Sequence, residues 1–228
     1  METFFADRRD AGKRLAERLS AYRGVKNVIV LALPRGGVPV AFEIAKALDA
    51  PLDLMLVRKL GVPDDEELAM GAVALGGACV FNRSVIKNIG IPRPLIEDVI
   101  AAERKELSRR NEAYRGNRLP PDLKDRTVIL VDDGMATGAD MRAAVKAVKK
   151  QAPARVIVAV PVGSGEACES LQKLADEVVC LQIPPLFFGV GGAYEDFSQT
   201  SDEEVKALIE ESQELSHHHL PSAHNTLT

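Results

Sequence analysis

One segment near the middle of the chain constrains the fold more than any other. Four apolar residues, 128–131, are followed directly by Asp132 and Asp133. An uninterrupted apolar run is typical of a strand buried on both faces, as in a parallel sheet. A short turn containing two glycines and Thr137 comes next, and a helical pattern begins after it. Because parallel strands are usually joined through helices, this segment predicts an α/β architecture.

The same segment predicts an anion site. Backbone N–H groups of a small-residue turn, together with the dipole of the following helix, bind phosphate groups. Two carboxylates beside such a turn suit vicinal hydroxyls, so the predicted ligand is a phosphorylated sugar. The turn lacks the lysine of the nucleotide-triphosphate P-loop, G-x-x-x-x-G-K-[ST], and does not fit that class. A buried strand that ends in a solvated Asp-Asp turn is the simpler alternative, but it would not require Thr-Gly four residues later.

At these residues the chain resembles the type I phosphoribosyltransferases, whose ligand is phosphoribosyl pyrophosphate (PRPP). The family pattern is four apolar residues, two acids, a few variable residues and then Thr-Gly-x-Thr or Thr-Gly-x-Ser. The sequence matches through Gly138 and departs at Asp140, which stands where the final hydroxyl residue is expected. It looks closest to a bacterial phosphoribosyltransferase-like group, for which no acceptor is established. That group has Leu-Pro-Arg-Gly-Gly and a C-terminal Phe-x-x-Val-Gly-x-x-Tyr-x-Asp-Phe stretch, both present here.

The rest of the chain continues the alternation of strands and helices. We expect strands at 28–32, 52–57, 156–160 and 177–181, a β-hairpin of 70–75 with 78–81, and helices at 7–22, 37–48, 92–115, 139–150, 166–175 and 202–211. Residues 58–68 are polar and rich in turn formers, which predicts a mobile loop. The alternation predicts a doubly wound, mostly parallel sheet with helices on both faces.

We interpret residues 1–215 as a single phosphoribosyltransferase-like domain. The resemblance implies a small hood, or cap, subdomain, for which residues 76–120 and 184–200 are the candidates. Residues 216–228 contain three adjacent histidines and many small polar residues, and they predict a disordered tail. The resemblance also implies a homodimer.

Bulk composition narrows the function classes. The chain has 228 residues, 46% hydrophobic and 27% charged, which suits one α/β domain with a substantial core. The net charge of −4 and the lack of a basic run argue against nucleic-acid binding. The sequence contains neither an apolar run of about 18 residues nor a signal-peptide core, so we expect no membrane partner. Cys79, Cys168 and Cys180 are far apart, which predicts reduced thiols in a cytoplasmic protein.

Two further segments extend the predicted site. Leu33-Pro34-Arg35-Gly36-Gly37 follows the first core strand, where the family has its pyrophosphate loop. An arginine fork and two glycines suit an anion, although the same residues also suit an ordinary strand-to-helix turn. Arg58 and Lys59 end the strand predicted at 52–57, at the carboxyl edge of the sheet, and a solvated basic pair is the alternative there. In the family the loop that follows closes over the site and excludes water.

The resemblance implies a Mg²⁺-dependent transfer of the phosphoribosyl group from PRPP to a nucleobase-like nitrogen heterocycle, with release of pyrophosphate. It assigns catalysis to Asp132, Asp133, Lys59 and Arg35; 5′-phosphate binding to Gly134, Met135, Ala136, Thr137, Gly138 and Ala139; pyrophosphate binding to Arg35, Gly36, Gly37, Arg58 and Lys59; and base stacking to Phe187 or Phe188. Asp132 and Asp133 would hold Mg²⁺ through ribose hydroxyls or water. Core packing is an equal alternative for the two phenylalanines.

Two positions depart from the family pattern. Hypoxanthine-guanine enzymes have an aspartate at the place of Ala136, so a 6-oxopurine acceptor is disfavoured, whereas adenine enzymes can have alanine. If the Asp140 carboxylate lay about 5 Å from a phosphate of PRPP, repulsion would weaken PRPP binding by roughly 1–3 kcal/mol. Asp140 could instead cap the next helix with its side chain turned away. These departures keep a second hypothesis open, a non-catalytic PRPP- or nucleotide-binding regulatory protein.

Overall fold

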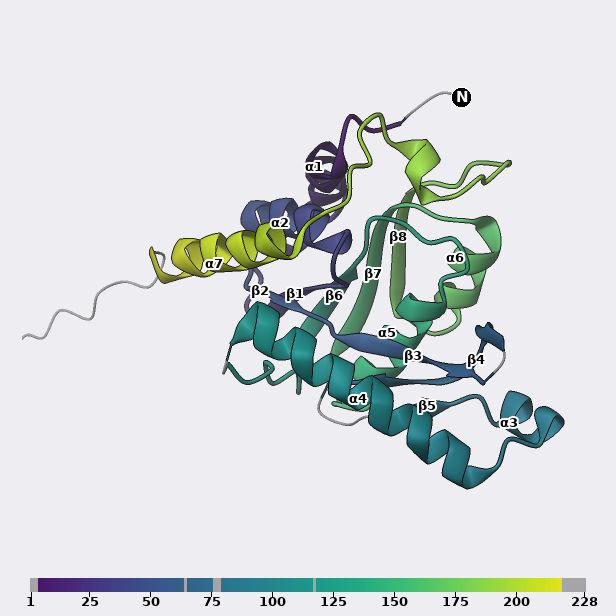
Figure 1. The fold of residues 1–228 in the computed structure, drawn as a ribbon. Coiled ribbons are helices and arrows are strands. Elements are labelled where there is room, and N and C mark those ends of the chain that lie inside the picture. Colours follow the sequence, from purple (N-terminus) through teal and green to yellow (C-terminus); the bar gives the residue numbers. More distant parts are fainter. Residues whose placement is uncertain (1–3, 64, 76–78, 117, 219–228) are drawn as a thin grey trace, which may run out of the picture.

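A five-stranded parallel sheet forms the centre of the computed structural model, which describes residues 4–63, 65–75, 79–116 and 118–218 (Figure 1). The strands are β1 (Val28–Ala32), β2 (Leu52–Leu54), β6 (Thr127–Val131), β7 (Arg155–Val162) and β8 (Glu177–Gln182). Their order is β2-β1-β6-β7-β8, and every pairing is parallel. The predicted doubly wound α/β fold is therefore confirmed.

Helices cover both faces of this sheet, because alternate strand residues enter two different cores. Val30 and Ile129 pack with the helices α1 (Arg8–Arg18), α2 (Gly37–Leu48) and α7 (Asp202–His218). Leu31 and Leu130 pack with α5 (Ala139–Lys149) and α6 (Gly165–Gln172) on the other face. This double burial explains why the middle strands β1, β6 and β7 consist largely of continuous apolar runs. None of the helices in the described ranges is both long and apolar enough to span a membrane.

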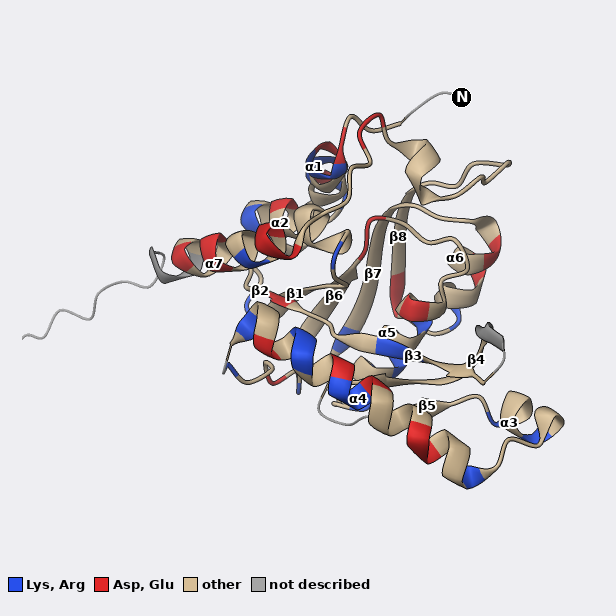
Figure 2. Cartoon of the chain, viewed as in Figure 1, with Lys and Arg blue, Asp and Glu red and all other residues tan. Residues whose placement is uncertain are grey.

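A second, antiparallel sheet forms the hood over one side of the central sheet. Its strands are β3 (Val57–Val62), β4 (Asp65–Ala74) and β5 (Cys79–Phe81), in the order β3-β4-β5. The predicted hairpin is confirmed by the pairing of β4 with β5, while its turn, 76–78, lies outside the described residues. The helices α3 (Arg83–Ile89) and α4 (Arg93–Arg115) follow, and α3 was not predicted. Blue and red segments alternate along α4 (Figure 2).

Two predictions between residues 52 and 68 are wrong. The strand predicted at 52–57 is divided, because β2 ends at Leu54 and β3 begins at Val57 in the other sheet. The residues predicted as a loop at 58–68 instead belong to the β3–β4 hairpin, apart from residue 64, which lies outside the described residues. Leu60 and Val62 are buried at alternate positions, a strand period that the neighbouring charges and turn formers concealed.

The two ends of the described chain are tied to the fold. The backbone amides of Phe4 and Phe5 donate to the carbonyl of Ala193, in the short 3₁₀ helix η2 (Val190–Ala193). The other 3₁₀ helix, η1 (Ser20–Tyr22), follows α1. Helix α7 runs to His218, beyond the predicted end at 211 and three residues into the segment predicted to be a disordered tail. Residues 219–228 lie outside the described ranges.

Candidate active site

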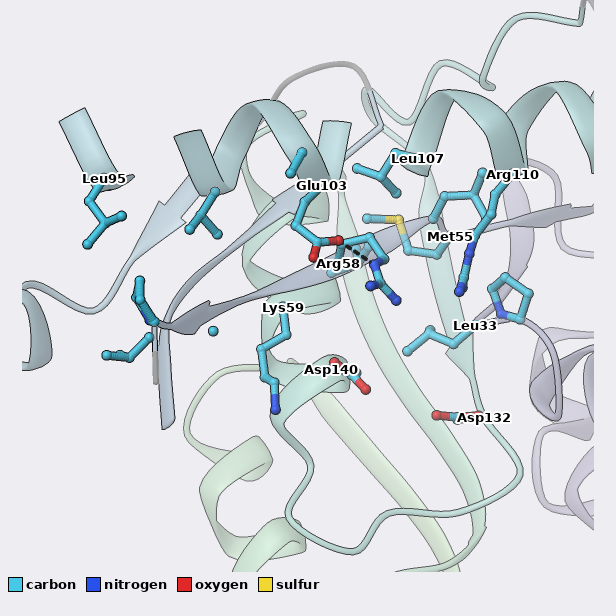
Figure 3. Close-up of a pocket in the computed structure, with 18 residues that line it drawn as sticks. Leu33, Met55, Arg58, Lys59, Leu95, Glu103, Leu107, Arg110, Asp132 and Asp140 are labelled. Carbon is cyan, nitrogen blue, oxygen red and sulfur yellow. Dashed lines mark hydrogen bonds and ion pairs between the residues drawn. The ribbon is translucent and has the colours of Figure 1, made fainter. Parts of the chain in front are cut away.

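A cavity of about 730 Å³ lies between the hood sheet, helix α4 and the carboxyl ends of the central strands (Figure 3). We call it the strand-end cavity. Charged side chains from three parts of the chain line it: Arg58, Lys59, Glu103, Arg110, Asp132 and Asp140. Apolar residues of α4 and of 55–57 form much of the remaining wall. The structure thus brings the predicted basic pair and one predicted acid into a single cavity.

The two adjacent acids at the end of β6 have different surroundings. Asp132 lines the strand-end cavity, whereas Asp133 is absent from its described lining. Burial raises the pKa of the Asp132 carboxyl well above its usual value, and the neighbouring charge of Asp133 raises it further. Burial also raises the pKa of Asp133, against an opposing effect of the guanidinium of Arg8. The site therefore holds two acidic groups for which the fold disfavours simultaneous ionisation.

Asp133 is held by residues from both ends of the chain. Nε of Arg8 donates to Oδ2 of Asp133 at 2.8 Å, and both side chains are nearly buried. The hydroxyl of Tyr194 donates to the Asp133 carbonyl at 2.5 Å. The Arg8 guanidinium lies 4.0 Å from the ring centroid of Phe197 and donates to the carbonyl of Ser198 at 2.7 Å. We call Arg8, Tyr194, Phe197 and Ser198 the terminal clamp.

The predicted phosphate loop joins β6 to α5 and rests on the end of β7. The Met135 amide donates to the carbonyl of Val162, so it is committed to the fold and is not free to bind an anion as predicted. Gly138 is the N-cap residue of α5 and has a φ of 67°, which favours glycine. The guanidinium of Arg142 donates to the Thr137 carbonyl at 2.6 Å, and the hydroxyl of Ser164 donates to the Ala136 carbonyl at 2.7 Å. Two side chains thereby fix the outer part of the loop.

Asp140 faces the strand-end cavity from the first turn of α5. Gly138, not Asp140, is the N-cap residue, and no side-chain hydrogen bond caps the helix. The capping hypothesis for Asp140 is therefore wrong. Figure 3 shows Asp140 between Lys59 and Asp132. The carboxylate thus lies on the same side as the predicted ligand.

Arg58 and Lys59 lie on β3, not at the end of β2 as the sequence predicted. They nevertheless line the strand-end cavity, because β3 crosses above the ends of the central strands. Arg58 donates to Glu103 of α4 at 2.6 Å. This hydrogen bond is the main cause that raises the pKa of Arg58, and the charge of Asp140 contributes.

The predicted pyrophosphate loop packs tightly under the two acids. A Cβ atom at Gly36 would lie 1.9 Å from Oδ2 of Asp133, and one at Gly37 would lie 2.8 Å from the carbonyl oxygen of Val131. Both positions therefore require glycine for close approach. Arg35 points elsewhere, because its guanidinium pairs with Asp202 at 3.6 Å, at the start of α7, and it is absent from the described lining of the cavity.

Phe187 and Phe188 are not brought into the strand-end cavity. They line a separate hollow of about 170 Å³, together with Phe4 and residues of 184–193. Phe188 is 73% exposed, whereas Phe187 packs partly against a small core around Phe5. The aromatic pair thus divides between an exposed ring and a packed one.

The donor set fits a hard divalent cation that is bound together with a substrate. The described residues contain no group of three or more His, Cys, Asp or Glu side chains that could hold a metal alone. Mg²⁺ is usually bound through one or two carboxylates, waters and substrate phosphates, without a dedicated protein cage. Asp132 in the strand-end cavity meets that requirement.

Sequence reasoning missed the terminal clamp and the contribution of α4. Arg8 and Asp133 are 125 positions apart, and Arg8 sits in a charged amphipathic segment in which nothing distinguishes it from its neighbours. Glu103 and Arg110 likewise look like solvent-facing charges of a long helix. Tyr194 and Phe197 belong to the C-terminal Phe-x-x-Val-Gly-x-x-Tyr-x-Asp-Phe stretch, but the sequence does not show which residues they contact.

Residues 6–197 match the family model of the phosphoribosyl transferase domain, so the chain belongs to that family. This confirms the resemblance to the phosphoribosyltransferase family.

Three relatives illustrate the match. "Putative phosphoribosyl transferase Rv0571c" of Mycobacterium tuberculosis is 47% identical over 206 residues, which cover 90% of this chain and 46% of that protein. The crystal structure of TT1426 from Thermus thermophilus is 46% identical, with a TM-score of 0.82, over 91% of this chain and 98% of that chain. "Bifunctional protein PyrR" of Deinococcus radiodurans is 32% identical over 124 residues, 51% of this chain and 65% of that protein. The chain thus spans about half the length of its mycobacterial relative.

Proposed function

We propose that the protein is a Mg²⁺-dependent phosphoribosyltransferase that transfers the 5-phosphoribosyl group of PRPP to a nucleobase-like nitrogen heterocycle and releases pyrophosphate. The observation that supports this most strongly is the strand-end cavity. Asp132 and the basic pair of β3 line it together, beside the loop that begins α5. Vicinal hydroxyls, a pyrophosphate and a 5′-phosphate each find groups of suitable chemistry there.

Each part of PRPP is assigned to a separate group of residues. Asp132 accepts hydrogen bonds from the ribose hydroxyls. The amides of residues 136–139 and the Thr137 hydroxyl bind the 5′-phosphate at the positive end of α5. Lys59, Arg58 and the backbone at Gly36 and Gly37 bind pyrophosphate. Arg35 joins them once its guanidinium leaves Asp202, to which it is bound at 3.6 Å.

The protein's contribution to the chemistry is positioning and charge stabilisation. Mg²⁺, when bound through Asp132 and substrate oxygens, neutralises charge on the pyrophosphate leaving group. As the bond from ribose C1 to pyrophosphate breaks, C1 develops positive character, and a ring nitrogen attacks from the opposite face. Lys59 and Arg58 stabilise the departing charge. The hood strands above the site limit access of water to the sugar carbon.

In this proposal the acceptor approaches from the side of residues 187–193. This segment adjoins the phosphate loop, because a Cβ atom at Gly134 would lie 2.5 Å from a methyl group of Val190. The exposed ring of Phe188 offers a face on which a planar base can stack. Ala136 supplies no proton acceptor, which favours an acceptor other than a 6-oxopurine.

The test is a panel in which purified protein receives Mg²⁺-PRPP and one nucleobase at a time, with pyrophosphate release as the readout. We expect release that depends on one base and is lost in Asp132→Asn. The matched control is Asp98→Asn, which removes an exposed carboxylate on α4 and should behave as the unmodified protein. Clear PRPP binding without release for any base would instead support the non-catalytic alternative, which the position of Asp140 favours.

We further propose a cytoplasmic homodimer. No disulfide joins Cys79, Cys168 and Cys180, which is the state that a reducing compartment maintains. Light scattering coupled to size-exclusion chromatography tests the dimer, since a mass near 24.6 kDa would contradict it.

A further inference from the structure

Arg8 makes three contacts around the second acid of the site, although the two residues are 125 positions apart in the sequence. Its guanidinium pairs with Asp133 at 2.8 Å, donates to the Ser198 carbonyl at 2.7 Å and stacks on Phe197. The Arg8 side chain is 11% exposed and that of Asp133 is 15% exposed. An ion pair this well shielded, with a second hydrogen bond on the same guanidinium, has a fixed geometry.

The surroundings hold Arg8 itself in place. It is the first residue of α1, whose N-cap residue Asp7 accepts a hydrogen bond from the Asp10 amide. The ring of Phe197 is stacked on that of Tyr194, with centroids 5.1 Å apart. Tyr194 in turn donates to the Asp133 carbonyl, and burial raises the pKa of its hydroxyl, so it remains a donor at neutral pH. Both the backbone and the side chain of Asp133 are therefore fixed by the terminal clamp.

The ion pair also determines where the Asp133 carboxylate can be. It lies against Gly36 of the predicted pyrophosphate loop, so close that a Cβ atom there would overlap it. Asp132, Asp140 and Glu103 already place three carboxylates in the strand-end cavity, of which Glu103 is paired with Arg58, and Asp133 is not in its described lining. A further carboxylate in that cavity would repel a ligand that carries several phosphate charges.

We infer that Arg8 is a positioning residue of the PRPP site, which keeps the carboxylate of Asp133 against Gly36 and out of the strand-end cavity. This inference rests on the proposed function. Asp132 is then the acid that meets the ligand, and Asp133 is a structural anion that joins α1 to the pyrophosphate loop. Without Arg8, the Asp133 carboxylate loses its partner in a shielded site and turns toward the open cavity, where it can be hydrated.

The experiment measures affinity for Mg²⁺-PRPP by isothermal titration calorimetry, with thermal unfolding followed in parallel. Arg8→Gln should weaken binding at least tenfold at a temperature at which the variant is fully folded. The matched control is Arg14→Gln on the same helix, where Arg14 pairs with Asp10 and contacts the Phe5 ring. It should lower the unfolding temperature without a change in affinity. Asp133→Asn in the Arg8→Gln background should restore most of the affinity, because the released side chain is then uncharged.

The outcomes separate the two proposals. Absence of Mg²⁺-PRPP binding by the unmodified protein would overturn the proposed function and the role of Arg8 with it. Binding by the unmodified protein and equal binding by Arg8→Gln would overturn the role of Arg8 alone. If Asp133→Asn by itself loses as much affinity as Arg8→Gln and gives no rescue, Asp133 binds the ligand directly and the positioning role is again overturned.

Discussion

Gly36→Ala tests the packing of the pyrophosphate loop against Asp133. The φ and ψ of Gly36 are −59° and −32°, which alanine adopts without strain, so any effect is steric. The new Cβ would lie 1.9 Å from Oδ2 of Asp133, whereas real Cβ contacts stay beyond 3.0 Å. The two atoms must therefore separate by at least 1.1 Å, the difference between these distances. A shift of that size breaks the 2.8 Å hydrogen bond from Arg8.

We expect Gly36→Ala to lower the free energy of unfolding by about 3 kcal/mol. Overpacking destabilises the fold by roughly 1–3 kcal/mol and loss of a hydrogen bond to a charged group by about 1.5–3 kcal/mol. Replacing glycine also makes the unfolded chain less flexible, which stabilises the fold by about 0.4–1 kcal/mol. For a domain of this size the unfolding temperature should fall by roughly 6–12 °C. Affinity for Mg²⁺-PRPP should fall as well, because the moved carboxylate displaces the loop.

Differential scanning calorimetry and titration with Mg²⁺-PRPP provide the two readouts. Gly165→Ala is the matched control, since its Cβ would meet only a methyl group of Ile183, at 3.9 Å. It should unfold within a few degrees of the unmodified protein and bind equally. If Gly36→Ala behaves like this control, the Asp133 carboxylate does not lie against Gly36 as the structure has it.

Three further changes probe the same region. Asp140→Thr removes a carboxylate from the strand-end cavity and should tighten Mg²⁺-PRPP binding about tenfold, whereas an unchanged dissociation constant would show that Asp140 does not oppose the phosphate. Burial raises the pKa of Asp132 in the folded state, so the folded protein loses stability as pH rises from about 4 through that pKa. Asp132→Asn should therefore raise the unfolding temperature at pH 8 and leave it nearly unchanged at pH 3.5, and equal shifts at both values would contradict this. Tyr194→Phe removes the donor to the Asp133 carbonyl and should lower the free energy of unfolding, measured in urea, by about 1–2 kcal/mol. An unchanged free energy of unfolding would show that water replaces the hydroxyl as donor.

Much of the central sheet could be predicted because its signals are local. The apolar runs at 28–32 and 128–131 are buried on both faces, so their composition alone marks them as strands of a parallel sheet. The glycine at 138 ends a loop and begins a helix, which also follows from local backbone preference. Once the order of strands and helices is known, the carboxyl edge of the sheet places Asp132 at the site.

The hood and the clamp could not be predicted in the same way, because they depend on contacts between distant segments. The chain leaves the central sheet after Leu54 and starts a second one at Val57, within an apolar run that reads as one strand. Asp140 looked able to cap its helix, and only the position of the cavity shows which way it faces. Arg8 packs against Phe197, and the residues around neither position predict this contact.

A crystal structure of the protein with Mg²⁺ and PRPP would show whether the strand-end cavity binds PRPP. We expect PRPP in this cavity, with its ribose hydroxyls at Asp132, its 5′-phosphate on residues 136–139 and its pyrophosphate against Lys59 and Arg58. Asp133 should remain paired with Arg8. An empty cavity at saturating PRPP, or PRPP bound with its 5′-phosphate away from the loop that begins α5, would show that this is not the PRPP site.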